Sequence, residues 1–395
     1  MKSSPDRLSI FVGLPLAVLS VLYYCSCTML LWDIPKLTLR FQGYPLAPDF
    51  ANYWCAARLT LAGKAAIAYN IFDLHGLQKS IFGVHHYYGC GWYYPPTFLL
   101  VVLPLAFFPY LAALAIWALL TFLGYAFTLR RIDHHPFFLL MGLTFPGALI
   151  NILFGQNGLL SATLLGGALL LLEPAPIWSG VLIGLLSYKP SLAILAFLAL
   201  AVGRHWRALV AAVVGASAFA LLSLLAFGTE PWLAYIHNFS TPMHLLEMGA
   251  ADWSIIPTFF SAVLSLGYGI VTAYIVQGLV ALVSGSAVVY AWSKETSLPI
   301  RGSILILATL LFTPYLFVYD LALLAFPLAW MWLHGCNRGW LWGERSILVL
   351  GWLVPLGSMI IWQLRIVDQA KVQVGPVILL GCLVLTLIRL KSPNR

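Results

Sequence analysis

The chain has 395 residues, of which 62% are hydrophobic and only 9% are charged. No water-soluble core needs so much apolar surface, so the composition excludes an ordinary soluble enzyme and indicates a membrane protein with many spans. There are 21 Lys and Arg residues against 13 Asp and Glu residues, which gives a formal net charge of +8. These basic residues are scattered among loops and form no continuous stripe, so no nucleic-acid partner is expected.

About twelve apolar runs are expected to cross the membrane. A bilayer core needs about 20 apolar residues per helix, and several runs are shorter, which indicates tilted or broken helices within a bundle. The expected spans are residues 8–32, 97–129, 137–154, 158–172, 177–187, 191–202, 208–227, 270–292, 304–317, 321–333, 346–364 and 377–390. The sequence therefore predicts one all-α polytopic membrane domain, residues 1–395, embedded in the lipid bilayer.

The basic residues set the expected orientation of these spans. If the N-terminus is cytoplasmic and every run crosses, the loops that follow residues 129, 202, 292 and 333 carry Lys and Arg and face the cytoplasm. This arrangement follows the positive-inside rule. Both termini are then cytoplasmic, and the two longest outer loops, residues 33–96 and 229–254, are extracytoplasmic.

The first outer loop contains the stretch APDFANYWCAARLTLAGK, residues 47–64. Its aromatic and aliphatic residues recur at helical spacing from residue 50 to residue 61, and Gly63 follows as a stop signal. A helix with aromatic residues on one face and basic residues near its end is expected to lie in the membrane interface, as is a second helix over residues 71–82. The aromatic residues from Tyr87 to Tyr94 suit the headgroup belt, although one or two of them can stack on a sugar ring.

Polar residues gather at the outer ends of the expected spans. They are Asp49 after the first span, Gln156 and Asn157 in LFGQNGLL, Lys189 in LLSYKPSLA, and Tyr319 and Asp320 in FTPYLFVYDLALL. An ionisable group among apolar residues is costly and usually faces the interior of the bundle, so Lys189 and Asp320 are candidate functional residues. A lone ammonium at this depth needs an anionic partner, which is either Asp320 or the phosphate of a ligand.

Each of these ionisable residues also has a purely structural interpretation. Asp49 follows a proline and precedes a helix, where it can serve as the N-cap residue. Lys189 and Asp320 can pair with each other and hold two helices together. Asp320 can also reach water from the end of its span. The sequence leaves these interpretations open beside the functional ones.

Metal and nucleotide sites have no clear signature in this chain. The candidate metal ligands in the second outer loop are His237, His244, Glu247 and Asp252, but they lack the close spacing typical of metal-binding motifs. The chain contains no Asp-x-Asp pair and no nucleotide-binding motif. We therefore expect neither a metal nor a cofactor. Two cysteines of the first outer loop, Cys55 and Cys90, can form a disulfide in an oxidising compartment, but two cysteines do not establish one.

Five stretches of the chain carry a resemblance to a known family. They are PDFANYWCAARLTLAGKAAIAYN, YYPPTFLLVVLPLAFFPYLAALAIW, FGQNGLLSATLLGGALLLL, GVLIGLLSYKPSLAIL and TPYLFVYDLALL. Together they resemble the polyprenyl-phosphate glycosyltransferases of GT-C architecture, and specifically glycosyltransferase family 87. The resemblance implies a multi-span enzyme that works on the extracytoplasmic face. Such an enzyme moves a hexose, with mannose favoured, from a polyprenyl-phosphate sugar to a lipid or glycan acceptor.

The resemblance also implies roles for the candidate residues. Asp49 occupies the place of the family's proposed catalytic base, which takes the proton of the acceptor hydroxyl. Lys189 lies where the family has a lysine and would bind the donor phosphate, with Arg58 as a second candidate cation. A single displacement of this kind inverts the configuration of the anomeric carbon and needs no metal.

The remaining candidates would contact the substrates. Gln156 and Asn157 would bind sugar hydroxyls, and Tyr319 and Asp320 are further candidates for substrate binding. Two other functions stay open from the sequence alone. The chain can be a transporter or flippase of lipid-linked sugars, which needs no base, or a non-catalytic subunit of envelope assembly.

Overall fold

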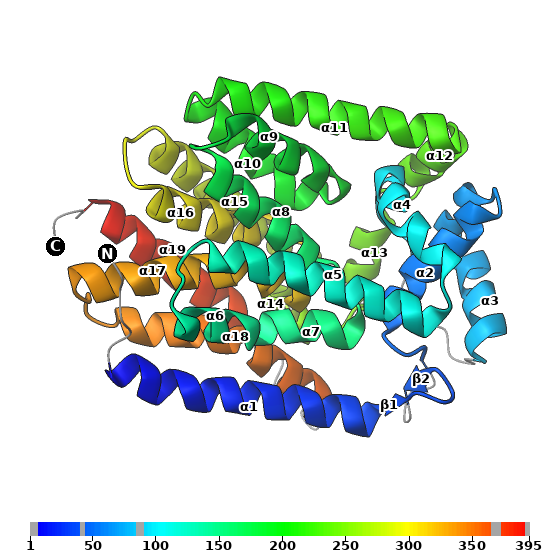
Figure 1. Cartoon of the computed structure of the whole chain (residues 1–395), viewed down its shortest axis with the longest axis horizontal. Coiled ribbons are helices and arrows are strands. Elements are labelled where there is room, and N and C mark those ends of the chain that lie inside the picture. The colour runs from blue at the N-terminus through cyan, green and yellow to red at the C-terminus, as the bar shows by residue number, and fades with distance from the viewer. Residues whose placement is uncertain (1–6, 40–43, 84–90, 365–372, 392–395) are drawn as a thin grey trace.

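The computed structural model of the protein describes residues 7–39, 44–83, 91–364 and 373–391. Within these ranges nearly all of the regular structure is helical, and the exception is a short antiparallel hairpin of β1 (Trp32–Asp33) and β2 (Thr38–Leu39). Helix α1 (Arg7–Leu31) begins, and helix α19 (Gly375–Lys391) ends, at the left of Figure 1. The hairpin, α2 (Pro48–Leu61) and α3 (Ile71–Phe82) lie at the opposite end of the bundle.

Five of the described helices are long and apolar enough to cross a membrane by themselves. They are α1, α5 (Tyr110–Arg130), α11 (Trp206–Phe227), α15 (Ile270–Trp292) and α18 (Glu344–Leu364). The shorter apolar helices are α8 (Gly158–Leu171), α9 (Pro176–Leu185), α10 (Pro190–Val202) and α16 (Leu298–Phe312), and α17 (Ala325–Arg338) follows α16. The all-helical, multi-pass fold is confirmed, whereas the predicted count of about twelve spans is not, because most of the predicted runs form helices too short to span alone.

Two of the predicted spans are broken helices. The run over residues 97–129 forms α4 (Pro96–Val102) and the 3-10 helix η2 (Leu103–Phe107), and α5 begins only after Pro109. The run over residues 137–154 forms α6 (Pro136–Leu143) and α7 (Pro146–Phe154), which are bent by 44°. Proline lacks an N–H and disfavours a helical conformation in the residue before it, so each break falls at a proline.

The first outer loop folds differently from the predicted interfacial pair. Ten of the 14 residues of α2 are buried within the protein, so this helix does not lay one apolar face on lipid as an isolated amphipathic helix would. Its alanine and aromatic residues are spread round the helix, so more than one of its faces packs into the core. Helix α3 buries only one face, with Leu74, Gln78 and Phe82 inside, and covers α2 from the outer side.

The second outer loop holds short helices that the sequence analysis did not predict. They are α12 (Glu230–His237), α13 (Thr241–Glu247) and the 3-10 helix η4 (Trp253–Ile255), followed by α14 (Phe259–Ser265). Proline is the second residue of both α12 and α13, where its fixed φ favours the first turn. Across the described ranges, no three His, Cys, Asp or Glu side chains are grouped so that they could hold a metal ion.

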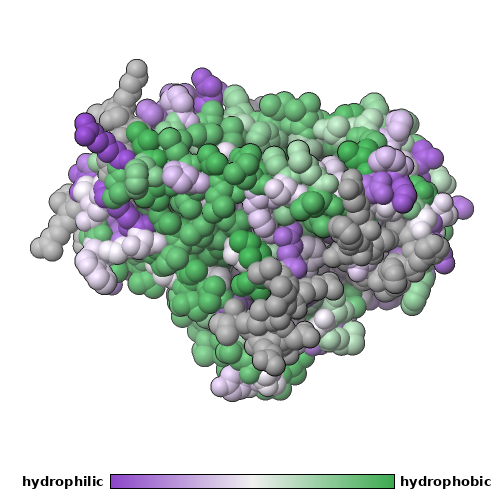
Figure 2. Space-filling view, turned by 90° about the horizontal axis from the view of Figure 1, so that it is seen from below, coloured by the Kyte–Doolittle hydropathy of each residue, from purple (hydrophilic) through white to green (hydrophobic). Residues whose placement is uncertain are grey.

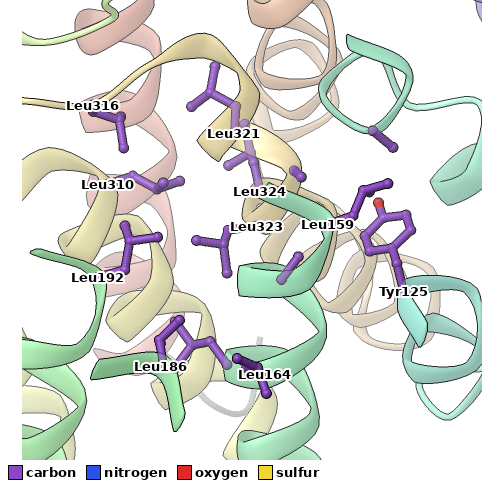
Figure 3. Close-up of a cluster of buried hydrophobic side chains, with 14 of the residues drawn as sticks. Tyr125, Leu159, Leu164, Leu186, Leu192, Leu310, Leu316, Leu321, Leu323 and Leu324 are labelled. Carbon is purple, nitrogen blue, oxygen red and sulfur yellow. The ribbon is translucent and has the colours of Figure 1, made fainter. Parts of the chain in front are cut away.

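One part of the core is built mainly from leucines. They surround the 3-10 helix η5 (Val318–Leu324), as Figure 3 shows. The residues labelled there are Leu159 and Leu164 of α8, Leu186 before α10, Leu192 of α10, Leu310 of α16, Leu316, Leu321, Leu323 and Leu324, together with Tyr125 of α5. All of them are buried. This packing anchors η5, which carries Tyr319 and Asp320, against the start of α8.

Glycines allow α9 and α11 to pack at close range. A Cβ atom on Gly180 would lie 2.2 Å from the carbonyl oxygen of Ala208, and one on Gly184 would lie 2.8 Å from that of Ala212. Small residues let the backbones of two helices in lipid approach closely and so increase their van der Waals contact. On the outside, Figure 2 shows hydrophobic residues over the middle of one face and hydrophilic residues toward its two ends. This distribution fits a bundle that lies in a bilayer.

A buried ion pair joins the last two helices. Glu344 of α18 is fully buried and Arg389 of α19 is 1% exposed. The Nε atom of Arg389 donates to Oε1 of Glu344 at 3.0 Å, and a second guanidinium nitrogen pairs with Oε2. Oε2 also accepts from the backbone N–H of Leu341 at 2.8 Å. The pair thereby closes the turn between α17 and α18 onto the end of α19.

Candidate functional site

The site is built around the corner between α7 and α8, residues 155–158. Gly155 has φ 68°, and a Cβ atom there would lie 2.4 Å from Cβ of Phe50 in α2. A Cβ atom on Gly158 would lie 2.2 Å from the carbonyl oxygen of Tyr319. The two glycines therefore let α2 approach the corner from one side and η5 from the other, which a larger residue would prevent.

Lys189 lies at the centre of the polar residues on the η5 side. It is the N-cap residue of α10, and its side chain is 11% exposed. Its Nζ atom forms an ion pair with Asp320, which is 1% exposed, and donates to Oδ1 of Asn157 at 3.4 Å. The same atom lies 5.3 Å from the ring centroid of Tyr319. The structure therefore brings together four of the residues predicted from the sequence.

Asp49 lies on the other side of the corner, in the first turn of α2. It is half-buried, and the N-cap residue of the helix is Ala47, two positions earlier. The interpretation of Asp49 as the N-cap residue was therefore wrong, although its carboxylate still lies at the positive end of the helix dipole. Ala47 adopts a left-handed φ of 48°, and the hydroxyl of Tyr110 donates to its carbonyl oxygen at 3.3 Å. A buried hydrogen bond thus holds the turn that precedes Asp49.

Hydrogen bonds link α2 to the corner and to the loop before α4. Tyr53 follows Asp49 by one turn and lies on the same face of α2. Its hydroxyl donates to Oε1 of Gln156 at 2.6 Å and lies 3.0 Å from the hydroxyl of Tyr94. The backbone carbonyl of Gln156 accepts from Nε1 of Trp117 at 3.3 Å. Gln156 is thus held from two sides, and Asp49 is joined to the corner through Tyr53.

The same two carboxylates shift the pKa values of two tyrosines of the site. Burial raises the pKa of Tyr94, and the charges of Asp320 and Asp49 raise it further. Burial also raises the pKa of Tyr319, to which Tyr94, Asp49 and Asp320 add. The half-buried side chains of Asp49, Tyr94, Lys189 and Tyr319 form one polar cluster, which we call the outer cluster.

The sequence analysis did not assign the aromatic residues around this cluster to the interior. Trp92 is 1% exposed and stacks on Phe98 at 5.6 Å, so its predicted place in the headgroup belt was wrong. Tyr188 is buried, stacks on Phe98 at 4.6 Å, and its hydroxyl lies 2.7 Å from that of Ser161. The only hint in the sequence was the position of Tyr188 directly before Lys189.

Arg58 and Cys55 lie apart from the outer cluster. Arg58 is exposed and follows Asp49 by nine residues, which is about 14 Å along the helix. Its guanidinium donates to the carbonyl oxygen of Ala106 at 3.3 Å and lies over the ring of Trp54. Cys55 is a buried free cysteine, and Cys90 lies outside the described residues. The structure thus does not bring Arg58 to Lys189.

Comparison with known proteins identifies the family. The sequence model of glycosyltransferase family 87 matches residues 92–314, which is more than half of the chain. The matched region contains Gln156, Asn157 and Lys189, begins after Asp49 and ends before Asp320. Searches of curated proteins and of solved structures found no match. The chain belongs to glycosyltransferase family 87 and is a membrane glycosyltransferase.

Proposed function

We propose that this glycosyltransferase transfers a hexose, with mannose favoured, from a polyprenyl-phosphate sugar to a lipid or glycan acceptor on the extracytoplasmic face. The observation that carries the proposal is the outer cluster, in which a nearly buried lysine, paired with Asp320, lies over the ring of Tyr319, and the half-buried Asp49 shifts the pKa of that same tyrosine. Helix α2, which carries Asp49, lies at the end of the bundle opposite the start of α1 and the end of α19. With cytoplasmic termini, as the positive-inside rule predicts, this end is extracytoplasmic.

Asp49 would act as the general base. The acceptor hydroxyl loses its proton as its oxygen attacks the anomeric carbon, and a carboxylate within hydrogen-bond reach takes that proton. Tyr53 holds α2 against Gln156, so the position of Asp49 is fixed relative to the corner. Attack from the face opposite the leaving group forms one bond as the other breaks, and the product has the inverted configuration.

Lys189 would stabilise the leaving phosphate. Negative charge grows on the phosphate as the glycosidic bond breaks, and an ammonium already held in a water-poor site stabilises that charge without reorganising. Asp320 and Asn157 hold the ammonium in place before the donor binds. Lys189 supplies the positive charge, so the proposed reaction needs no metal ion.

The lipid chain of the donor would lie between helices. A cavity with mostly apolar walls opens among α1, α5, α6, α17 and α18. Ala325, the first residue of α17, lines this cavity and follows Asp320 by five residues. A phosphate at Lys189 and an apolar chain in the cavity would therefore contact the same segment, η5 with α17.

Replacement of the proposed base tests this function directly. Purified protein is incubated with a panel of polyprenyl-phosphate sugars and a membrane lipid extract, and the products are identified by mass spectrometry. Asp49→Asn should abolish transfer while the protein still folds and binds the donor. Asp73→Asn is the matched control, because Asp73 also lies in the first turn of a helix in the same outer segment but is exposed.

The outcomes separate the proposed roles. Full transfer by Asp49→Asn would show that another group is the base. Movement of the lipid-linked sugar across the membrane without any glycosyl product would favour a flippase. Chelation of divalent cations should leave the rate of transfer unchanged, and a complete loss would contradict the metal-independent mechanism.

A further inference from the structure

The buried side chain of Asn151 makes three hydrogen bonds, and two of them reach outside its own helix. Asn151 lies in α7 and is 2% exposed. Its Nδ2 atom donates to the carbonyl oxygen of Gly147 at 2.7 Å and to that of Tyr319 at 2.9 Å. Its Oδ1 atom accepts from the backbone N–H of Gly158 at 2.7 Å. The amide therefore has one orientation only, because a flip would place the wrong atom at all three partners.

The two outside partners of Asn151 are the chain neighbours of the two residues that hold Lys189. Gly158 directly follows Asn157, and Tyr319 directly precedes Asp320. Asn157 and Asp320 are the hydrogen-bond and ion-pair partners of the Lys189 ammonium. One buried amide thus sets the distance between the start of α8 and η5. That distance determines where the ammonium is held.

We propose that Asn151 is a positioning residue that holds the Lys189 ammonium ready for the donor phosphate. This inference rests on the proposed function, because it takes Lys189 as the phosphate-binding group. Asn151 itself touches no substrate in this proposal. Without its two outside bonds, the start of α8 and η5 can separate, and Lys189 loses the fixed geometry that favours a phosphate.

Loss of the phosphate contact is measured most directly with a probe that carries no sugar. The wild type and each variant are placed in nanodiscs, and the dissociation constants of radiolabelled short-chain polyprenyl phosphate and of the matching polyprenol are measured. A defect in folding or in the lipid cavity weakens the binding of both ligands. A defect that acts through Lys189 weakens the binding of polyprenyl phosphate only.

Asn151→Ser is the most informative variant. A serine hydroxyl in a helix can still donate to the carbonyl four residues earlier, so the bond to Gly147 is kept while the bonds to Tyr319 and Gly158 are lost. Its dissociation constant for polyprenyl phosphate should rise about ten-fold, as for Lys189→Ala, with that for polyprenol unchanged. The double variant should bind no more weakly than Lys189→Ala alone, because both changes act on one contact.

Asn238→Ser is the matched control. Asn238 also donates to the carbonyl four residues earlier, that of Ala234 at 2.9 Å, but it lies at the end of α12, a helix that contributes no residue to the outer cluster. Its dissociation constants should equal those of the wild type. If Asn151→Ser does not fold, Gly158→Ala serves instead, because its Cβ atom would lie 2.2 Å from the carbonyl oxygen of Tyr319 and 2.7 Å from Oδ1 of Asn151, and would therefore disturb both contacts of the Asn151 amide. It should cause the same selective loss of phosphate binding.

Three results would overturn the inference. If Lys189→Ala weakens polyprenyl phosphate and Asn151→Ser does not, the inference fails while the proposed phosphate site stands. If the dissociation constant of polyprenyl phosphate in the double variant rises by the product of the two single effects, Asn151 acts independently of Lys189. If Lys189→Ala leaves the binding of polyprenyl phosphate unchanged, the proposed phosphate site fails, and the inference fails with it.

Discussion

Gly155→Ala should misplace the proposed base. The new Cβ atom would lie 2.4 Å from Cβ of Phe50, and an ordinary contact begins at 3.4 Å, so Phe50 must move about 1 Å. No rotamer change moves a Cβ atom away, because it is bonded directly to the backbone of α2. The first turn of α2, with Asp49 beside Phe50, must therefore shift. A misplacement of about 1 Å can cost about 100-fold in rate, which is the loss of transfer that we expect.

The same substitution should also lower the free energy of unfolding. The left-handed φ of 68° costs about 1–2 kcal/mol for a residue with a Cβ atom, and overpacking adds about 1–3 kcal/mol. Gly63→Ala separates the two effects. Gly63 follows the same helix with φ 72°, and no atom lies within 4 Å of its Cβ position. This control should show the backbone cost alone and keep normal transfer.

The assay compares both variants with the wild type at saturating donor. Transfer is followed with the polyprenyl-phosphate sugar that the panel identifies, and stability is followed by thermal unfolding in detergent. Equal transfer rates and equal melting temperatures for Gly155→Ala and Gly63→Ala would refute the argument. They would mean that α2 absorbs the extra methyl group without moving Asp49.

Three further predictions concern stability, and thermal unfolding in detergent measures each. Glu344→Gln should destabilise the protein by about 3–5 kcal/mol, because it removes the carboxylate that pairs with a buried guanidinium. The double variant Glu344→Leu with Arg389→Met should be close to neutral, because it removes both charges. A double variant less stable than the single variant would contradict this prediction. Burial lowers the pKa of His205 below its usual 6.5. The unfolded state therefore binds more protons than the folded state, and the free energy of unfolding should fall as the pH drops from 7.5 to 5.5. His205→Gln should reduce this pH dependence, and an unchanged dependence would exclude His205 as its source. Gly180→Val should strongly destabilise the contact between α9 and α11. Gly215→Ala should be tolerated, because the nearest atom would lie 3.6 Å from its Cβ atom. Equal melting temperatures for the two variants would rule out this packing argument.

Local signals predicted the secondary structure well. Helix α3 covers residues 71–82 as predicted, because Asn70 caps its start and Gly83 ends it with φ 63°. The helical spacing from residue 50 to residue 61 likewise became α2. Signals of this kind act within one turn, so they need no knowledge of the remaining chain. The number of complete spans was harder to predict, since prolines break long apolar runs and the bundle accepts short helices.

The amino-acid sequence was sufficient to predict an all-helical membrane protein and to single out the ionisable residues at the ends of its apolar runs. The folded structure was needed to show that α2 is buried, that Lys189 is held between Asp320 and Asn157, and that Arg58 lies elsewhere. It also revealed Asn151, which looks like an isolated polar residue in an apolar run. The physical reason is that hydropathy and capping are local properties. Hydrogen bonds between α7, α8 and η5 join segments far apart in the chain, and no local pattern records them.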